Sequence, residues 1–89
     1  MLDKREYTQS VANGTLELLR GDKISKLVRK KYTLGAETRI VCNMLREPSN
    51  SRYLTEFIEH EEYVDTCKAQ VNAEFAEAER RYRDEIQDT

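Results

Sequence analysis

The only histidine of the chain, His60, lies in an acidic stretch with four glutamates around it: Glu56, Glu59, Glu61 and Glu62. Glu56 precedes His60 by four residues, so both side chains share one face if the stretch is helical, and Cys67 follows one heptad later. Imidazole, carboxylate and thiolate groups are ligands for transition metals. A ferritin-type di-iron site, however, requires a glutamate three residues before the histidine, and that residue is Phe57. We therefore interpret the stretch as a solvated helix face and predict no metal site.

The two cysteines, Cys42 and Cys67, are the strongest nucleophiles in the chain, and each would need a base to become reactive. His60 is the only histidine that could serve, but on one helix it would lie roughly 10 Å from Cys67 along the axis. The sequence also lacks a glycine-rich phosphate loop and the HExxH motif of zinc proteases. We predict no catalytic residues and no cofactor: the chain is not an enzyme, and its thiols are reduced core residues.

A second group of residues that could bind a ligand is the cationic segment at positions 20–31: Arg20, Lys23, Lys26, Arg29, Lys30 and Lys31. This basic patch could bind phosphates, with Tyr32 stacking on a base. However, Tyr32 falls on the apolar face of the same segment, and an isoelectric point of about 5.5 is low for a nucleic-acid-binding domain. Nucleic-acid binding is thus the less favoured alternative. The cations are expected to face acidic groups of the same chain or of a neighbouring one.

The length and composition predict one small domain, residues 1–89, with a modest core. Apolar residues make up 38 % and charged residues 36 %, which is typical of long solvated helices. No apolar run approaches the length of a membrane span, and the charged N-terminus does not resemble a signal peptide, so we expect a cytoplasmic protein without a membrane partner. Residues 1–46 have a formal charge of +5 and residues 47–89 one of −7. This asymmetry favours contact between the two halves, within one chain or head to tail between copies.

The elements that would position these residues are mostly helices, so the predicted fold class is mostly α. In residues 1–21, Asn13-Gly14 is a strong signal for a β-hairpin, since both residues tolerate positive φ, but Thr15 could equally be the N-cap of a short helix. Gly21-Asp22 marks a break. Residues 22–47 are predicted to form two short helices, the first ending near residue 32 and the second running from the N-cap residue Thr33 to the turn at Pro48.

A single long helix is predicted from residue 51 to residue 87, because this stretch contains neither glycine nor proline and repeats apolar residues at heptad spacing. The heptads are imperfect, so the helix is only partly coiled-coil-like. It would be roughly 55 Å long, and we expect the preceding fifty residues to be too few to cover it. The end of its apolar stripe is then the predicted protein interface: Val71, Phe75, Ala78, Tyr82 and Ile86.

Two short blocks, residues 26–33 (KLVRKKYT) and residues 62–69 (EYVDTCKA), resemble a loose class of small helical proteins encoded by bacteriophages and prophages. The resemblance covers residues 24–75, and Gly35-Ala36 departs from it where acidic residues are expected. It implies a context, the host cytoplasm or the virion, and carries over no site residues. Proteins of this kind are virion or assembly components, or inhibitors that dock on a host protein.

Together these patterns predict a non-enzymatic protein-binding module, a small phage structural or assembly protein that self-associates through its long helix. Residues 24–45 would fold back on residues 53–68, leaving the stripe at 71–86 for a second copy or a larger assembly. The alternative is an anti-defence inhibitor whose acidic helix mimics nucleic acid and binds a host nuclease. A nucleic-acid-binding protein that uses the basic patch is the third and least favoured hypothesis.

Overall fold

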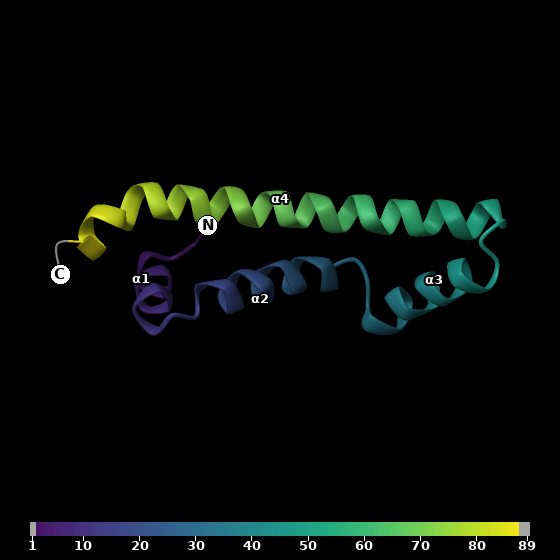
Figure 1. Cartoon of the computed structure of the whole chain (residues 1–89), viewed down its shortest axis with the longest axis horizontal. Coiled ribbons are helices and arrows are strands. Elements are labelled where there is room, and N and C mark those ends of the chain that lie inside the picture. The colour runs from purple at the N-terminus through teal and green to yellow at the C-terminus, as the bar shows by residue number, and fades with distance from the viewer. Residues whose placement is uncertain (1, 88–89) are drawn as a thin grey trace.

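Three short helices lie in a row along one side of a long fourth helix (Figure 1). The structure, a computed structural model, describes residues 2–87, and the side chains of residues 2–83. Its helices are α1 (Lys4–Asn13), α2 (Leu16–Arg29), α3 (Leu34–Arg46) and α4 (Ser51–Gln87), and the described residues form no strand. The molecule measures 56 × 19 × 18 Å, so its length is that of α4. The predicted mostly helical fold with a long C-terminal helix is thereby confirmed.

Residues 13 and 14 end a helix instead of turning a hairpin, so the alternative of an N-terminal β-hairpin is wrong. Gly14 follows the last residue of α1 and has a φ of +70°. Its N–H donates to the carbonyl of Val11 over 3.2 Å, and the N–H of Thr15 donates to the carbonyl of Ser10 over 2.9 Å. These two bonds make up a Schellman motif. A hairpin would need the same positive φ from this glycine, which is why the sequence signal is ambiguous.

The glycines Gly14 and Gly21 should respond in opposite ways to replacement by alanine. A side chain at the positive φ of Gly14 is strained, so Gly14→Ala should lower the free energy of unfolding by about 1–2 kcal/mol. Gly21 lies inside α2, and an added Cβ would meet nothing within 4 Å, so Gly21→Ala should raise that free energy by about 1 kcal/mol. Urea denaturation followed by circular dichroism measures both. An unchanged or raised free energy of unfolding in Gly14→Ala would contradict the helix end at Gly14, and a lowered one in Gly21→Ala would contradict an uninterrupted α2.

The predicted break at Gly21-Asp22 is wrong, because α2 continues through it and ends at Arg29. Tertiary packing explains why one glycine does not stop the helix. Four apolar side chains of α2, before and after the glycine, pack against the main core: Leu16, Leu19, Ile24 and Leu27. Their burial outweighs the cost of about 1 kcal/mol for a glycine in a helix interior.

The boundaries of α3 and α4 are fixed by side-chain caps. The hydroxyl oxygen of Thr33 accepts a hydrogen bond from the N–H of Ala36 over 3.0 Å, which confirms Thr33 as the N-cap of α3. At the start of α4, the side-chain oxygen of Asn50 accepts from the N–H groups of Arg52 and Tyr53 over 3.0 and 3.3 Å. The predicted span of 51–87 for the long helix is confirmed.

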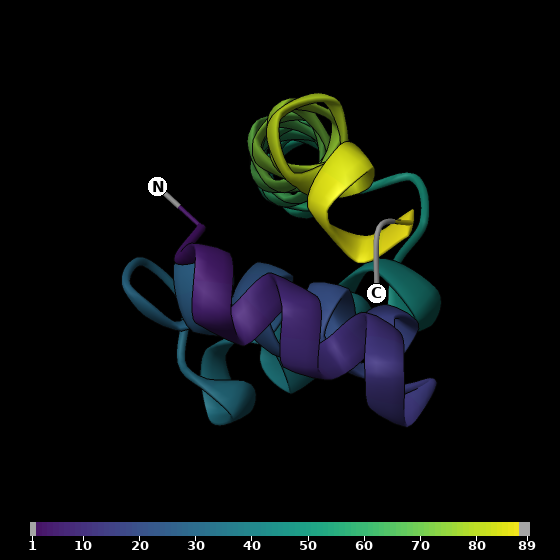
Figure 2. The ribbon, with the colours of Figure 1, turned by 90° about the vertical axis from the view of Figure 1, so that its left-hand side faces the viewer.

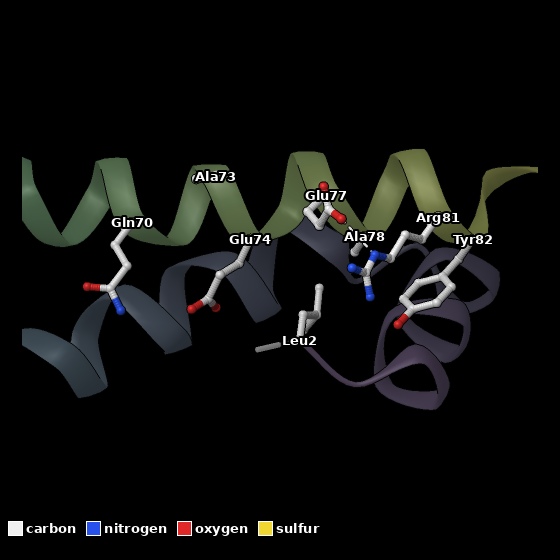
Figure 3. Close-up of a pocket in the computed structure, with 8 residues that line it drawn as sticks. All are labelled: Leu2, Gln70, Ala73, Glu74, Glu77, Ala78, Arg81 and Tyr82. Atoms are coloured by element: carbon white, nitrogen blue, oxygen red, sulfur yellow. Dashed lines mark hydrogen bonds and ion pairs between the residues drawn. The ribbon is translucent and has the colours of Figure 1, made fainter.

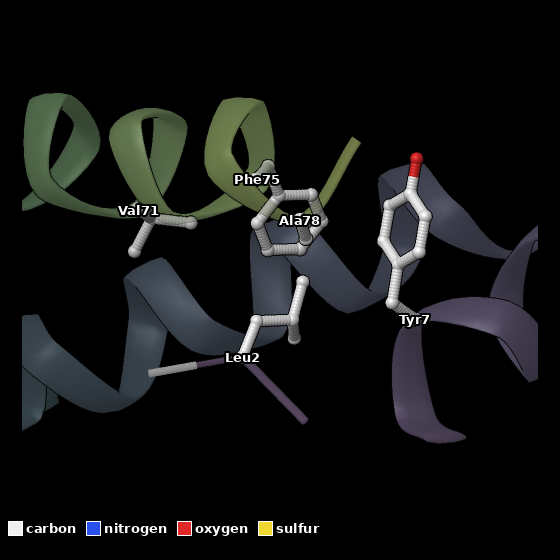
Figure 4. Packing of buried hydrophobic residues seen from close by; sticks show 5 residues of the cluster. All are labelled: Leu2, Tyr7, Val71, Phe75 and Ala78. Carbon is white, nitrogen blue, oxygen red and sulfur yellow. The ribbon is translucent and has the colours of Figure 1, made fainter. Parts of the chain in front are cut away.

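The main core lies between the N-terminal segment and the second half of α4 (Figure 4). Two residues of the N-terminal segment, Leu2 and Tyr7, pack with Val71, Phe75 and Ala78 of α4, and all five side chains are buried. Viewed from the C-terminal end of α4, α1 lies across the direction of the long helix (Figure 2). The first fifty residues therefore cover α4 as far as Tyr82, including the stripe beyond Val71 that they were expected to be too few to cover.

The other half of the molecule is thinner. α3 is the helix that packs against the first part of α4, and α2 packs against the part that follows (Figure 1). The buried side chains outside the main core are few: Ser10, Val28, Ile40, His60 and Cys67. Two helices in contact cannot enclose a core from all sides, so this end leaves apolar side chains at the surface.

Candidate protein-interaction surface

The six cations of the basic patch do not form one exposed surface. Five of them have a partner within the chain. The guanidinium of Arg20 lies 5.1 Å from the ring centre of Phe75, and Lys31 lies 4.8 Å from that of Tyr63. The other three are in ion pairs: Lys23 with Glu6 at 2.8 Å, Lys26 with Asp22 at 3.0 Å and Arg29 with Glu37 at 2.6 Å. These contacts hold helices together or pair charges on one helix, and they disperse the patch.

The residues predicted as a protein interface lie mainly in the core of a single chain. Val71 is 1 % exposed, Phe75 3 % and Ala78 3 %. Tyr82 is half-buried, and its ring centre lies 6.0 Å from that of Tyr7. The side chain of Ile86 lies outside the described residues. An interface built on Val71, Phe75 and Ala78 would require the N-terminal segment to move away first.

The sequence suggested that His60 lies on a solvated face, but its side chain is buried and only 6 % exposed. Its Nε2 is hydrogen-bonded to Oε2 of Glu37 on α3. The other oxygen of the same carboxylate contacts Arg29 of α2 at 2.6 Å. Glu37 thus joins α2, α3 and α4 through one carboxylate, and we call the trio Arg29, Glu37 and His60 the clasp. No periodicity reveals it in the sequence, since Glu37 and His60 are 23 residues apart.

The surroundings of the clasp are polar and aromatic. The hydrogen bond to His60 holds the pKa of the Glu37 carboxyl below its ordinary value; partial burial opposes this, and Arg29 adds to it. The ring of Tyr32 meets His60 edge-on at 4.9 Å. Nδ1 of His60 has no hydrogen-bond partner and lies 3.5 Å from the carboxylate of Glu61. Within residues 2–83 no three His, Cys, Asp or Glu side chains gather as a metal site would require.

The most distinctive surface of the molecule is apolar and lies beside the clasp. Five large apolar side chains of the described residues are exposed, and four of them belong to α3 and the start of α4: Leu34 (68 %), Leu45 (70 %), Leu54 (42 %) and Ile58 (45 %). The fifth, Leu18, lies on α2. Exposed apolar side chains that cluster in this way mark contact surfaces.

Helical geometry shows that these side chains share one side of the α3–α4 pair. A polar cavity on one side is lined by Arg39, Asn43, Arg52, Tyr53 and Glu56. Each apolar residue follows a polar one by two positions, which is about 200° around the helix axis: Val41 after Arg39, Leu45 after Asn43, Leu54 after Arg52 and Ile58 after Glu56. Leu34 continues the row of Val41 and Leu45 at helical spacing. We call this set, Leu34, Val41, Leu45, Leu54 and Ile58, the apolar flank.

A cavity of about 390 Å³ borders the apolar flank at Val41 and reaches the clasp at Glu37 and His60. It is lined by Glu37, Thr38, Val41, Cys42 and His60. The flank therefore has a recess with polar groups at its base, as contact surfaces with an anchoring side chain have. This surface was not among the predictions from the sequence, although the spacing of its apolar residues on α3 and α4 indicates it.

No protein-family model matches the chain, and no curated protein or solved structure is significantly similar to it. Within the described residues, no helix is long and apolar enough to cross a membrane.

Proposed function

We propose that the chain is a non-enzymatic protein-binding module that self-associates through the apolar flank. The long helix takes part, as the sequence suggested, but through its first turns and not through the stripe at 71–86. The observation that carries the proposal is the gathering of four of the five exposed large apolar side chains on one side of α3 and α4.

A second copy supplies what the thin end of the molecule lacks. Two antiparallel helices with one apolar side are half of a four-helix bundle. In a two-fold symmetric dimer, the apolar flank of a second copy would pack against the flank of the first. The contact would be about 20 Å long, the length of α3, and two helices wide. This is near the lower end of stable interfaces, so we expect a dimer with a dissociation constant in the micromolar range.

The charge of residues 34–65 should make the dissociation constant of this dimer depend on salt. Residues 34–65 contain three arginines and seven acidic residues, a formal charge of −4. Like charges meet when two such halves pack together, and salt screens their repulsion. Raising the salt concentration should therefore tighten the dimer, whereas it would weaken binding to a basic partner.

Sedimentation equilibrium over a concentration series tests self-association directly. We expect twice the mass of the chain at high concentration. A reductant is needed because Cys42 is exposed and is not the core residue that the sequence predicted, whereas Cys67 is buried. Leu45→Asp should raise the dissociation constant at least about tenfold, since it places a charge in the apolar contact. Leu18→Asp is the matched control, because Leu18 is equally exposed but lies on α2.

A chain that stays monomeric up to several hundred micromolar would refute self-association, and so would an equal effect of the two aspartate variants.

The phage context implied by the resemblance remains part of the proposal: a virion or assembly component in the host cytoplasm or the particle. The alternative inhibitor is favoured by one observation, the exposed acidic face of α4 formed by Glu59, Glu61, Glu62 and Asp65. A monomer that binds a host nuclease would support that alternative.

A further inference from the structure

A groove runs along the other side of α4, away from the apolar flank. It consists of two neighbouring cavities of about 410 and 250 Å³, which share the lining residues Gln70 and Glu74. Leu54 of the flank and Glu74 of the groove are twenty residues apart, which is about 200° around α4. The groove extends for roughly 18 Å between Gln70 and Tyr82.

One end of the groove is apolar (Figure 3). The larger cavity is lined by Leu2, Ala73, Ala78 and the ring of Tyr82, and Glu77 and Arg81 stand at its edge. Glu77 already forms two ion pairs, since Arg80 and Arg81 both contact its Oε1 at 2.6 Å. The alanines leave room beside α4, so this end can accept a large apolar side chain from outside.

The other end of the groove is cationic. Three lysines line the smaller cavity together with Leu27, Val71 and Glu74: Lys23 and Lys26 of α2, and Lys30 just after it. Lys23 is already paired with Glu6, so Lys26 and Lys30 are the lysines offered to a ligand. Lys30 is exposed, and the side chain of Lys26 is 74 % exposed. Lys26 pairs with Asp22 one turn away, and an exposed pair of this kind contributes little, so an incoming carboxylate can replace Asp22 at small cost.

We propose that this groove binds an amphipathic acidic helix of another protein, with its apolar side chains at the Tyr82 end and its carboxylates at the lysine end. The length of the groove corresponds to about three helical turns. An apolar cavity followed by a cationic one is complementary in charge and polarity to such a helix, and open grooves of this form are used for helix recognition. The site is separate from the apolar flank, so the two surfaces can be occupied independently.

Binding of a synthetic peptide tests this inference on the full chain. The probe is an amphipathic peptide of about four turns with leucines on one face and glutamates in its last turn, and its twin has lysines in place of the glutamates. Fluorescence anisotropy should show at least about tenfold tighter binding of the acidic peptide. This preference should decrease as salt is added.

Two variants with matched controls locate the site. Ala73→Trp fills the apolar end and should weaken binding at least about tenfold, whereas Ala69→Trp, an exposed alanine of α4 outside both cavities, should change it less than twofold. Lys26→Glu combined with Lys30→Glu should abolish the preference for the acidic peptide, and Lys68→Glu should preserve it. Circular dichroism checks that each variant folds.

Three outcomes would overturn the inference: no binding of the acidic peptide, equal binding of the two peptides, or equal effects of the two tryptophan variants. None of them bears on self-association, because the variants lie away from the apolar flank. Loss of dimerisation in Leu45→Asp, in turn, should leave binding of the peptide unchanged.

Discussion

Replacing Phe75 by alanine is expected to lower the free energy of unfolding by about 3–5 kcal/mol, because it removes a large buried side chain and leaves a cavity. Phe75 is 3 % exposed and lies in the cluster that joins α4 to Leu2 and Tyr7. A domain of this size has a total stability of about 5–15 kcal/mol, so the loss is a large part of it. Phe75→Leu keeps most of the volume and should cost less than about 1.5 kcal/mol.

The position of Phe75 gives this variant a second, local effect. The residue also lies under the guanidinium of Arg20, at 5.1 Å, and so contributes to holding α2 as well as the N-terminal segment. We expect the amides of α1 to lose protection from hydrogen exchange in Phe75→Ala, because the main core is what attaches α1 to α4.

Phe57→Ala is the matched control for Phe75→Ala. Phe57 is the only other phenylalanine, lies on the same helix and is half-buried outside the main core. Its replacement should cost clearly less in urea denaturation and leave α1 protected. If the two variants lose equal stability, or if α1 keeps its protection in Phe75→Ala, the main core is not what holds the N-terminal segment.

Local signals in the sequence predict α3 and α4 well, and they do so for physical reasons. Thr33 caps α3 because its side chain can reach the N–H of Ala36 three residues on. The absence of glycine and proline between residues 51 and 87 leaves nothing to interrupt α4. Asn13-Gly14 is different, because positive φ at Gly14 serves a hairpin and a helix end equally, and only the packing of α1 decides between them.

The arrangement of the helices is less predictable than their limits. The apolar stripe containing Val71 and Phe75 is visible in the sequence, but not the segment that covers it. Residues 24–45 fold back on residues 53–68 as expected, since Glu37 bonds to His60 and the Tyr63 hydroxyl donates to the carbonyl of Leu27. The residues before them also pack on α4, as far as Tyr82, so the short helices form a row along it (Figure 1). The partners Leu2 and Tyr7 come from the other end of the chain, and no local pattern specifies so distant a contact.

The clasp is unpredictable for the same reason. His60 has four glutamates close by in sequence, yet the carboxylate bonded to its Nε2 comes from Glu37 on α3. Periodicity within α4 can only show which neighbours share a face. It cannot show that Arg29, Glu37 and His60 meet, because that depends on how three helices pack.

Replacing Glu37 by glutamine should destabilise the fold at neutral pH by about 1–3 kcal/mol, because the variant loses charge-assisted bonds to Arg29 and His60 at a site that is mostly buried. The size of this loss should depend on pH. The pKa of the Glu37 carboxyl is lower in the folded chain than its ordinary value of about 4.3, so the unfolded chain binds the proton first as pH falls. The contribution of Glu37 is therefore complete above that value and is lost as pH falls through the folded pKa.

Urea denaturation of the wild-type chain and Glu37→Gln between pH 7 and about pH 3 measures this dependence. The difference between the two should shrink towards acid pH, whereas Glu59→Gln, which changes an exposed glutamate of α4, should follow the wild-type chain throughout. The other groups that face the clasp, Arg29, Tyr32 and Glu61, are kept in both variants, and Glu59→Gln controls for the loss of one carboxylate elsewhere on the chain. A constant gap between Glu37→Gln and the wild-type chain over this range would mean that the charge of Glu37 does not hold the three helices together.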